Sequence, residues 1–143
     1  MRALIAGLIF VAGAAGAEPV REVVTLTNQF RAQNGLGPLA VSPVLEAVAE
    51  VHGRDMAKKG IFSHTGSDGS SVGKRAKRQG YKFCLIAENI AKGQRSPQAV
   101  MQSWTTSKGH RKNMLLRKAR EIGVIRQAGN IWVMVLGTSK GGC

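Results

Sequence analysis

The dipeptide Ser-Pro occurs twice in this chain, as Ser42-Pro43 and Ser96-Pro97, and each copy has the form of a helix start. A serine hydroxyl accepts a hydrogen bond from a free backbone N–H of the first turn, and proline is favoured at the first helical position. The first copy precedes apolar residues at helical spacing as far as about Lys59, where Gly60 is a suitable stop. The second predicts a helix that continues through Trp104.

The remaining patterned segments predict two more helices and three strands. They are a helix over residues 19–34, a short basic helix over 72–79, and strands over 82–90, 121–127 and 130–138. The last two strands are joined by Ala128-Gly129 and are expected to form an antiparallel hairpin. Helices before, between and after so few strands indicate one layered α+β domain without repeats or linkers.

The N-terminal segment has the pattern of a secretory signal peptide. Met1-Arg2 is positively charged, residues 3–15 are apolar apart from glycines, and Ala15-Gly16-Ala17 fits a signal-peptidase site. A membrane anchor is the alternative, but the apolar run is shorter than the roughly 20 residues of a spanning helix. We therefore expect residues 1–17 to be removed and residues 18–143 to form a soluble domain that is secreted or periplasmic.

The chain is strongly basic, with 21 Lys and Arg against 8 Asp and Glu. Loss of Arg2 with the signal peptide leaves 20 basic and 8 acidic side chains, a formal charge of +12. The basic residues gather in two clusters, Lys74, Arg75, Lys77, Arg78 and Lys82, and Lys108, Arg111, Lys112, Arg117, Lys118 and Arg120. Nucleic acid is an unlikely partner, because no aromatic residues are interleaved with these clusters. An exported protein would instead meet an anionic envelope surface; a solvated basic face that aids solubility is the alternative.

Both cysteines, Cys84 and Cys143, lie beyond the predicted cleavage site. In an oxidising compartment two thiols in a small domain favour one disulfide, although a terminal cysteine could also pair between chains. A bond within the chain would tie the last residue to the strand that carries Glu88.

Three short segments carry the residues with the most chemical potential: Phe62-Ser63-His64-Thr65-Gly66, Ala87-Glu88-Asn89-Ile90 and residues 104–110, which end in Gly109-His110. An imidazole–carboxylate–imidazole set of His64, Glu88 and His110 could bind a divalent metal or transfer protons. The same set could also be a buried polar network that stabilises the fold. The third histidine, His52, lies on the apolar face of its helix and is expected to be a core residue.

The order of the chain's motifs resembles the CAP superfamily, which comprises cysteine-rich secretory proteins, antigen 5 and pathogenesis-related 1 proteins and is also called the SCP domain. The bacterial single-domain secreted branch is the most similar. The segments that carry the resemblance cover nearly all of the predicted mature chain. They are Asn28-Gln29-Phe30-Arg31, Gly35-Leu36-Gly37-Pro38-Leu39, Ala49, His52, Asp55-Met56, Phe62-Ser63-His64, Asp68-Gly69, Gly80-Tyr81, Glu88-Asn89-Ile90-Ala91, Trp104, Ser107, Gly109-His110, Asn113-Met114-Leu115 and Ile122-Gly123-Val124.

The resemblance implies a three-layer α-β-α sandwich with a small antiparallel sheet and a broad cleft. In many members two histidines and two glutamates meet in that cleft, and some of them bind zinc or another divalent ion. His64, Glu88 and His110 match three of these residues, whereas Ser107 stands where the second glutamate is expected. The implied cleft is lined by His64, Glu88, Ser107 and His110, and a metal would rest on His64, Glu88 and His110 alone.

The resemblance favours a secreted module that binds a lipid, sterol or protein partner, and no residue is predicted to be catalytic. The alternative is an extracellular hydrolase that depends on a divalent metal such as zinc in the same cleft. Ser63 and Ser107 lie close in sequence to histidines, as a serine nucleophile would require, but neither has the sequence of a nucleophile elbow.

Overall fold

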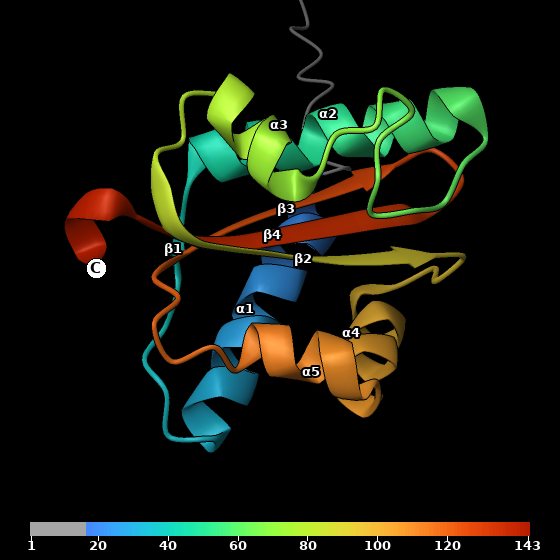
Figure 1. The fold of residues 1–143 in the computed structure, drawn as a ribbon. Coiled ribbons are helices and arrows are strands. Elements are labelled where there is room, and N and C mark those ends of the chain that lie inside the picture. The colour runs from blue at the N-terminus through green and yellow to red at the C-terminus, as the bar shows by residue number, and fades with distance from the viewer. Residues whose placement is uncertain (1–16) are drawn as a thin grey trace, which may run out of the picture.

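The computed structural model describes residues 17–143 and contains one four-stranded sheet in the order β1-β3-β4-β2 (Figure 1). Its strands are β1 (Ala40–Val41), β2 (Phe83–Lys92), β3 (Glu121–Gln127) and β4 (Ile131–Ser139). β3 and β4 form the predicted antiparallel hairpin, and β2 pairs antiparallel with β4. The two-residue strand β1 was not predicted, and it runs parallel to β3. The expected small antiparallel sheet is present as β2, β4 and β3, and the added parallel strand β1 makes the sheet mixed at this edge.

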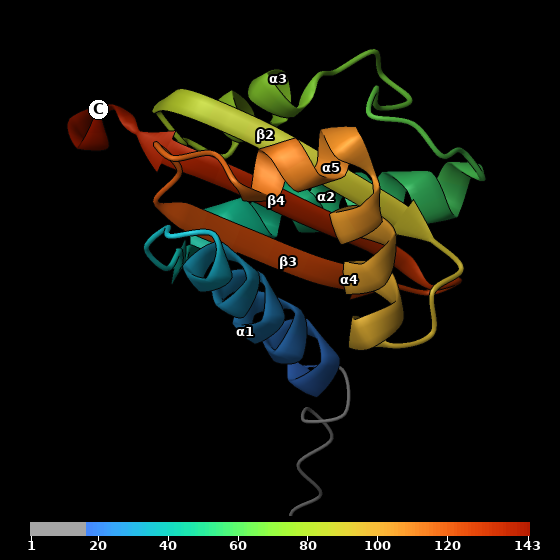
Figure 2. The ribbon, with the colours of Figure 1, turned by 90° about the horizontal axis from the view of Figure 1, so that it is seen from below.

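Helices cover both faces of the sheet, which confirms the predicted α-β-α sandwich (Figures 1 and 2). α2 and α3 lie on one face, and α1, α4 and α5 lie on the other. Their bounds are α1 (Ala17–Gln33), α2 (Pro43–Lys59), α3 (Val72–Arg78), α4 (Pro97–Thr106) and α5 (Lys108–Met114). A short 3₁₀ turn, η1 (Lys140–Gly142), follows β4. Neither α5 nor η1 was predicted.

The protein has two apolar cores, one on each face of the sheet, and strand β4 contributes side chains to both. Trp132, Met134 and Leu136 belong to the core beneath α1, α4 and α5, and Val133 and Val135 belong to the core beneath α2. All five side chains are fully buried. A strand covered on both faces is apolar at every position rather than at alternate positions, and this explains the continuous apolar run of β4.

Both serine caps form as the sequence predicts. The hydroxyl of Ser42 accepts from the N–H of Leu45 at 3.3 Å, and that of Ser96 accepts from the N–H of Ala99 at 3.1 Å. α2 ends at Lys59, where Gly60 takes a left-handed conformation with φ of 62°. Each cap contributes about 1 kcal/mol to helix stability.

The position of α2 depends on a glycine in the neighbouring strand. A Cβ atom at Gly123 of β3 would lie 2.3 Å from the backbone of Leu45 and Glu46. The first turn of α2 therefore contacts the sheet at a distance that only glycine permits. His52 lies two helical turns after Leu45, so the same close contact places its imidazole over the sheet.

Cys84 and Cys143 form a disulfide within the chain, with their Cα atoms 6.5 Å apart. This bond joins η1 to β2, the strand that carries Glu88, as predicted. The predicted signal peptide lies outside the described residues except for Ala17. Within residues 17–143, no helix combines the length and the apolar character needed to cross a membrane.

Candidate functional site

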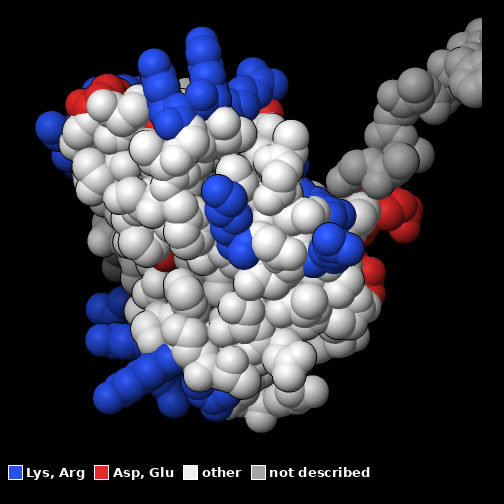
Figure 3. All heavy atoms as spheres, turned by 90° about the vertical axis from the view of Figure 1, so that its right-hand side faces the viewer, with Lys and Arg blue, Asp and Glu red and all other residues white. Residues whose placement is uncertain are grey.

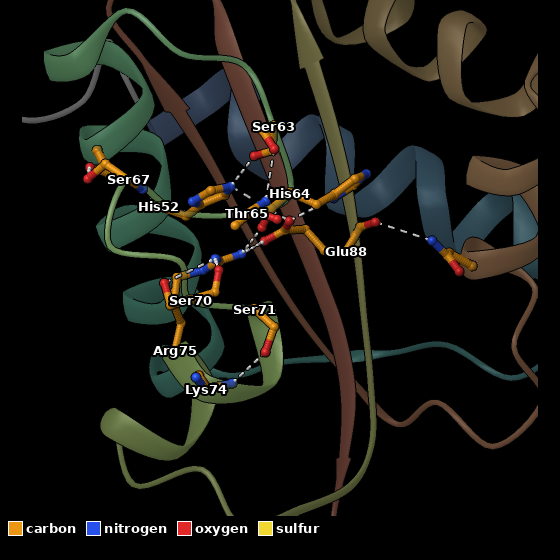
Figure 4. A network of polar contacts seen from close by, with 12 residues as sticks. His52, Ser63, His64, Thr65, Ser67, Ser70, Ser71, Lys74, Arg75 and Glu88 are labelled. Carbon is orange, nitrogen blue, oxygen red and sulfur yellow. Dashed lines mark hydrogen bonds and ion pairs between the residues drawn. The ribbon is translucent and has the colours of Figure 1, made fainter.

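Glu88 lies at the centre of a polar cluster on the α2 and α3 side of the sheet (Figure 4). It belongs to the edge strand β2, and its side chain is only 2% exposed. A carboxylate removed from water in this way requires hydrogen-bond donors and a positive charge nearby. Both are supplied by residues from the loop between α2 and α3 and from α3 itself.

The positive charge comes from Arg75 of α3, whose Nη2 donates to Oε2 of Glu88 at 2.8 Å. Arg75 is itself buried, and it also donates to the backbone carbonyls of Ser70 at 2.7 Å and His64 at 3.1 Å. One guanidinium therefore connects α3, the preceding loop and β2. Arg75 was expected in a solvated basic cluster, and for this residue that expectation was wrong. Its position three residues after Val72 and next to the buried Ala76 was a signal that it faces the core.

His64 contacts the other carboxylate oxygen. Its Nδ1 lies 2.8 Å from Oε1 of Glu88, while 59% of its side chain remains exposed. The ring thus links the buried charge to the protein surface. The hydrogen bond to Glu88 raises the pKa of His64 above its ordinary value of 6.5, an effect opposed by partial burial.

His52 of α2 approaches the same carboxylate from the core. It is fully buried, and its Nε2 lies 2.7 Å from the carbonyl oxygen of Ser63 and 3.8 Å from Oε1 of Glu88. Because a carbonyl only accepts, Nε2 carries the proton in the neutral ring. Nδ1 is buried without a hydrogen-bond partner among residues 17–143. Burial lowers the pKa of His52, so this imidazole stays neutral beside Glu88.

His110 is brought to β2 through a neighbour of Glu88. The side-chain amide of Asn89 donates to the carbonyl of His110 at 3.0 Å, and Asn113 donates to the carbonyl of Glu88 at 3.2 Å. Burial lowers the pKa of His110, and the nearby His64 lowers it further. The Nδ1 atom of His110 has no hydrogen-bond partner within the described part of the chain.

The two serines of the sequence analysis occupy structural positions. Ser107 separates α4 from α5 and is the N-cap residue of α5, three residues before His110. The hydroxyl of Ser63 accepts a hydrogen bond from the N–H of Thr65 at 3.1 Å, which stabilises the local turn. The loop that carries Ser63 and His64 is also tied to α2, because Asp55 accepts from both the N–H and the hydroxyl of Ser67 at 2.7 and 2.6 Å.

As arranged here, these side chains do not fit a divalent metal. Both oxygens of Glu88 already have partners, and the guanidinium of Arg75 would repel a second cation at the carboxylate. Within residues 17–143, no three His, Cys, Asp or Glu side chains are grouped as a metal site would require. The assignment of a metal to His64, Glu88 and His110 remains a prediction.

Most basic side chains outside this cluster are exposed to solvent, and Arg31 is a buried exception. On the face seen from the right of Figure 1, they gather at the upper and lower margins, and neutral surface occupies much of the area between (Figure 3). Acidic side chains are few on this face. The expected basic surface is therefore present here as separate groups rather than as one continuous patch.

The CAP family model, described as the cysteine-rich secretory protein family, matches residues 24–135. Among curated proteins, YkwD of Bacillus subtilis (strain 168) is 38% identical over 113 residues, which are 78% of this chain and 44% of the relative. The membrane protein YlbC of the same organism is 31% identical over 104 residues, which are 73% of this chain and 30% of the relative. This chain therefore spans less than half the length of these two relatives.

Solved structures give the same result for the fold. An extracellular protein containing an SCP domain from Bacillus anthracis str. Ames has a TM-score of 0.83 and 29% identity, and the match covers 87% of this chain and 41% of that one. An outer surface protein of Borrelia burgdorferi has a TM-score of 0.79 at 22% identity, over 86% of this chain and 94% of that one, and supports the fold alone. The family match and the YkwD identity establish that the chain belongs to the CAP, or cysteine-rich secretory protein, family.

Proposed function

We propose that this chain is an extracytoplasmic binding module. Its predicted signal peptide, residues 1–17, would direct export, and residues 18–143 would form the working domain. The SCP-domain structure from Bacillus anthracis is described as that of an extracellular protein, which supports this location. The ligand would contact the surface around His64 and His110, above the buried carboxylate of Glu88.

One observation carries the preference for binding over catalysis: the Glu88 side chain is only 2% exposed, and its two oxygens are directed to Arg75 and His64 inside the fold. A general base or metal ligand must be within reach of the reacting group, and this carboxylate is shielded from the surface. Glu88 instead orients His64 and connects it to Arg75, so its role here is to position a surface imidazole. The partly exposed rings of His64 and His110 can then donate or accept hydrogen bonds with a ligand.

The experiment uses the fact that the chain contains only three histidines. Their ring C–H signals can be followed separately by NMR while the purified protein is titrated with cholesterol in detergent micelles, with phosphatidylcholine vesicles and with Zn²⁺. A sterol or lipid that binds as proposed shifts the signals of His64 and His110 in a saturable manner. The signal of His52 serves as an internal control, because this ring is fully buried.

The variants His64→Gln and His110→Gln should weaken the response to the effective probe by about tenfold, the loss expected for one good hydrogen bond. Exposed Lys58→Gln on α2 should leave it unchanged. A saturable response to Zn²⁺ alone, lost in His64→Gln, would support the metal-dependent alternative. Absence of a response to every probe would contradict the proposed binding surface.

A further inference from the structure

A hollow separate from the cluster around Glu88 lies at the end of the sheet where the C-terminus is found. It has a volume of about 280 Å³ and is lined by Lys77, Gly80, Tyr81, Lys82, Phe83 and Lys140. Three segments supply these residues: the last turn of α3, the approach to β2, and η1. Figure 1 shows that the loop before β2 and the C-terminal turn lie at the same end of the molecule. Half of the lining residues are therefore lysines that come from separate parts of the chain.

Lys140, the lysine from the C-terminal turn, is held in place by a backbone hydrogen bond and by the nearby disulfide. The N–H of Lys140 donates to the carbonyl of Lys82 at 2.9 Å, and the disulfide of Cys143 with Cys84 attaches η1 to β2. Chain ends are usually poorly ordered unless they are tied down. The disulfide thus keeps a lysine from the C-terminal end of the chain beside lysines from the α3–β2 region.

Tyr81, one of the lining residues, is hydrogen-bonded to a carboxylate that lies outside the hollow. Tyr81 is buried and extends across Gly137, where a Cβ atom would lie 2.9 Å from its ring. Its hydroxyl donates to Glu121 at 2.5 Å, and Glu121 does not line the hollow. None of the lining residues is acidic.

Three lysines line one small space, and their positive charges would attract an anion bound there. Lysine only donates hydrogen bonds and is a common ligand of phosphate groups. Phe83 adds an apolar wall, and Nζ of Lys77 lies 5.9 Å from the centroid of its ring. The volume is near the lower limit of small-molecule sites, about 300 Å³, so it suits a group the size of a phosphate with a short organic attachment.

We propose that Lys77, Lys82 and Lys140 form a binding site for the phosphate group of an anionic ligand, with Phe83 in contact with the adjoining carbon atoms. The ligand is a soluble phosphate compound or the phosphate of a lipid headgroup, since both present the same chemistry. The site is separate from the cluster around Glu88 and does not depend on the function proposed for that cluster.

Two measurements on the purified protein at constant low ionic strength test this site. Thermal unfolding is followed as inorganic pyrophosphate is added, because a ligand that binds only the folded state raises Tm in a saturable manner. Co-sedimentation is measured with phosphatidylcholine vesicles that contain or lack phosphatidylglycerol. The test variant carries Lys77→Gln, Lys82→Gln and Lys140→Gln. The matched control carries Lys58→Gln, Lys59→Gln and Lys92→Gln, three equally exposed lysines outside the hollow.

The test variant should bind pyrophosphate, phosphatidylglycerol vesicles or both about tenfold more weakly, while the control retains wild-type affinity. An effect on pyrophosphate indicates a soluble ligand, and an effect confined to vesicles indicates a headgroup. The double variant Cys84→Ser, Cys143→Ser should also bind more weakly, because Lys140 is no longer held. Equal losses in both triple variants would mean that net charge alone attracts the anion, and would overturn the proposal. Unchanged binding of both probes by the test variant would overturn it as well.

Discussion

Two arginines on opposite faces of the sheet are buried, and their guanidinium groups are paired differently. Arg31 of α1 is 1% exposed and donates only to backbone carbonyls: to Gly37 at 2.9 Å, Met114 at 2.8 Å and Leu116 at 3.0 Å. It thereby ties the loop after α1 to the end of α5. Burial lowers the pKa of Arg31, and no carboxylate hydrogen-bonds to its guanidinium within the described residues.

Arg75 is 3% exposed and also holds a loop through carbonyls, those of Ser70 and His64. It differs in having a carboxylate partner, Glu88. Arg31 demonstrates that carbonyls alone can hold a buried guanidinium in this fold. The carboxylate beside Arg75 therefore adds something beyond anchoring a loop, namely a connection from the buried guanidinium to the imidazole of His64.

Arg75→Met should produce the largest loss of stability. It leaves Glu88 buried without its cationic partner, and breaking a buried pair in this way costs about 3–5 kcal/mol of the free energy of unfolding. Urea denaturation of both proteins measures the difference. Arg54→Met is the control, because Arg54 pairs with Glu50 at the surface and its loss should cost within about 0.5 kcal/mol.

The double variant Arg75→Met, Glu88→Gln separates the unpaired charge from the lost packing. Replacing the carboxylate by a neutral amide should recover part of the stability lost in Arg75→Met. If the double variant is less stable than Arg75→Met alone, the stability lost in Arg75→Met does not come from an unpaired Glu88. The countercharge would then not distinguish Arg75 from Arg31.

Arg31→Met should have a smaller effect, of about 2–3 kcal/mol. It removes donors from three backbone carbonyls but leaves no charge unpaired. The same denaturation experiment measures it, with exposed Arg21→Met on α1 as the control, which should change stability by at most about 0.5 kcal/mol. A cost that equals or exceeds that of Arg75→Met would contradict the importance assigned to the countercharge.

The smallest expected effect is on the pH dependence of stability. It comes from His64 and His52, the two histidines near the Arg75–Glu88 pair. The raised pKa of His64 means that its protonated form is favoured in the folded state. The resulting stability is fully present below pH 6.5 and is lost as the pH rises through the folded-state pKa. His52 acts in the opposite direction, because its lowered pKa makes the folded state less stable as the pH falls below 6.5.

Measurement of the free energy of unfolding from pH 5.5 to 8 in the wild type and in His64→Gln isolates the first contribution. The variant should lack the part of the stability that the wild type loses as the pH rises above 6.5. The difference should be modest, since solvent screens the mostly exposed ring. Parallel pH profiles would mean that the contact between His64 and Glu88 does not alter the titration of His64.

The sequence predicted those parts of the fold that depend on local signals. The Ser-Pro caps, the stop at Gly60 and the hairpin at Ala128-Gly129 are all present. The strand β1 was missed because two residues have no readable period, and their pairing with β3 is a tertiary contact. The helix α5 was missed because its seven residues are basic and polar, with only Met114 buried.

The candidate site divides in the same way. Glu88 was grouped with His64 and His110 from the residues alone, as an imidazole–carboxylate–imidazole set, and the family resemblance supported that grouping. Arg75 was hidden among surface lysines and arginines, because a basic residue in a short helix is usually solvated. His52 was recognised as a core residue, but its approach to Glu88 depends on how α2 packs on the sheet.

The sequence by itself determined the family and the main helices and strands, because caps, turns and periodicity act over a few residues and the order of motifs is read directly. Only the structure decided that Cys84 and Cys143 pair within one chain. Tertiary structure decided which charges meet. A buried Glu88 requires a cationic partner, because an unpaired buried charge is costly. The packing of α3 against β2 supplies Arg75 as that partner. Tertiary structure also decides that Lys140 lies beside Lys82, because the backbone N–H of Lys140 donates to the carbonyl of Lys82 and the disulfide attaches the C-terminal turn to β2.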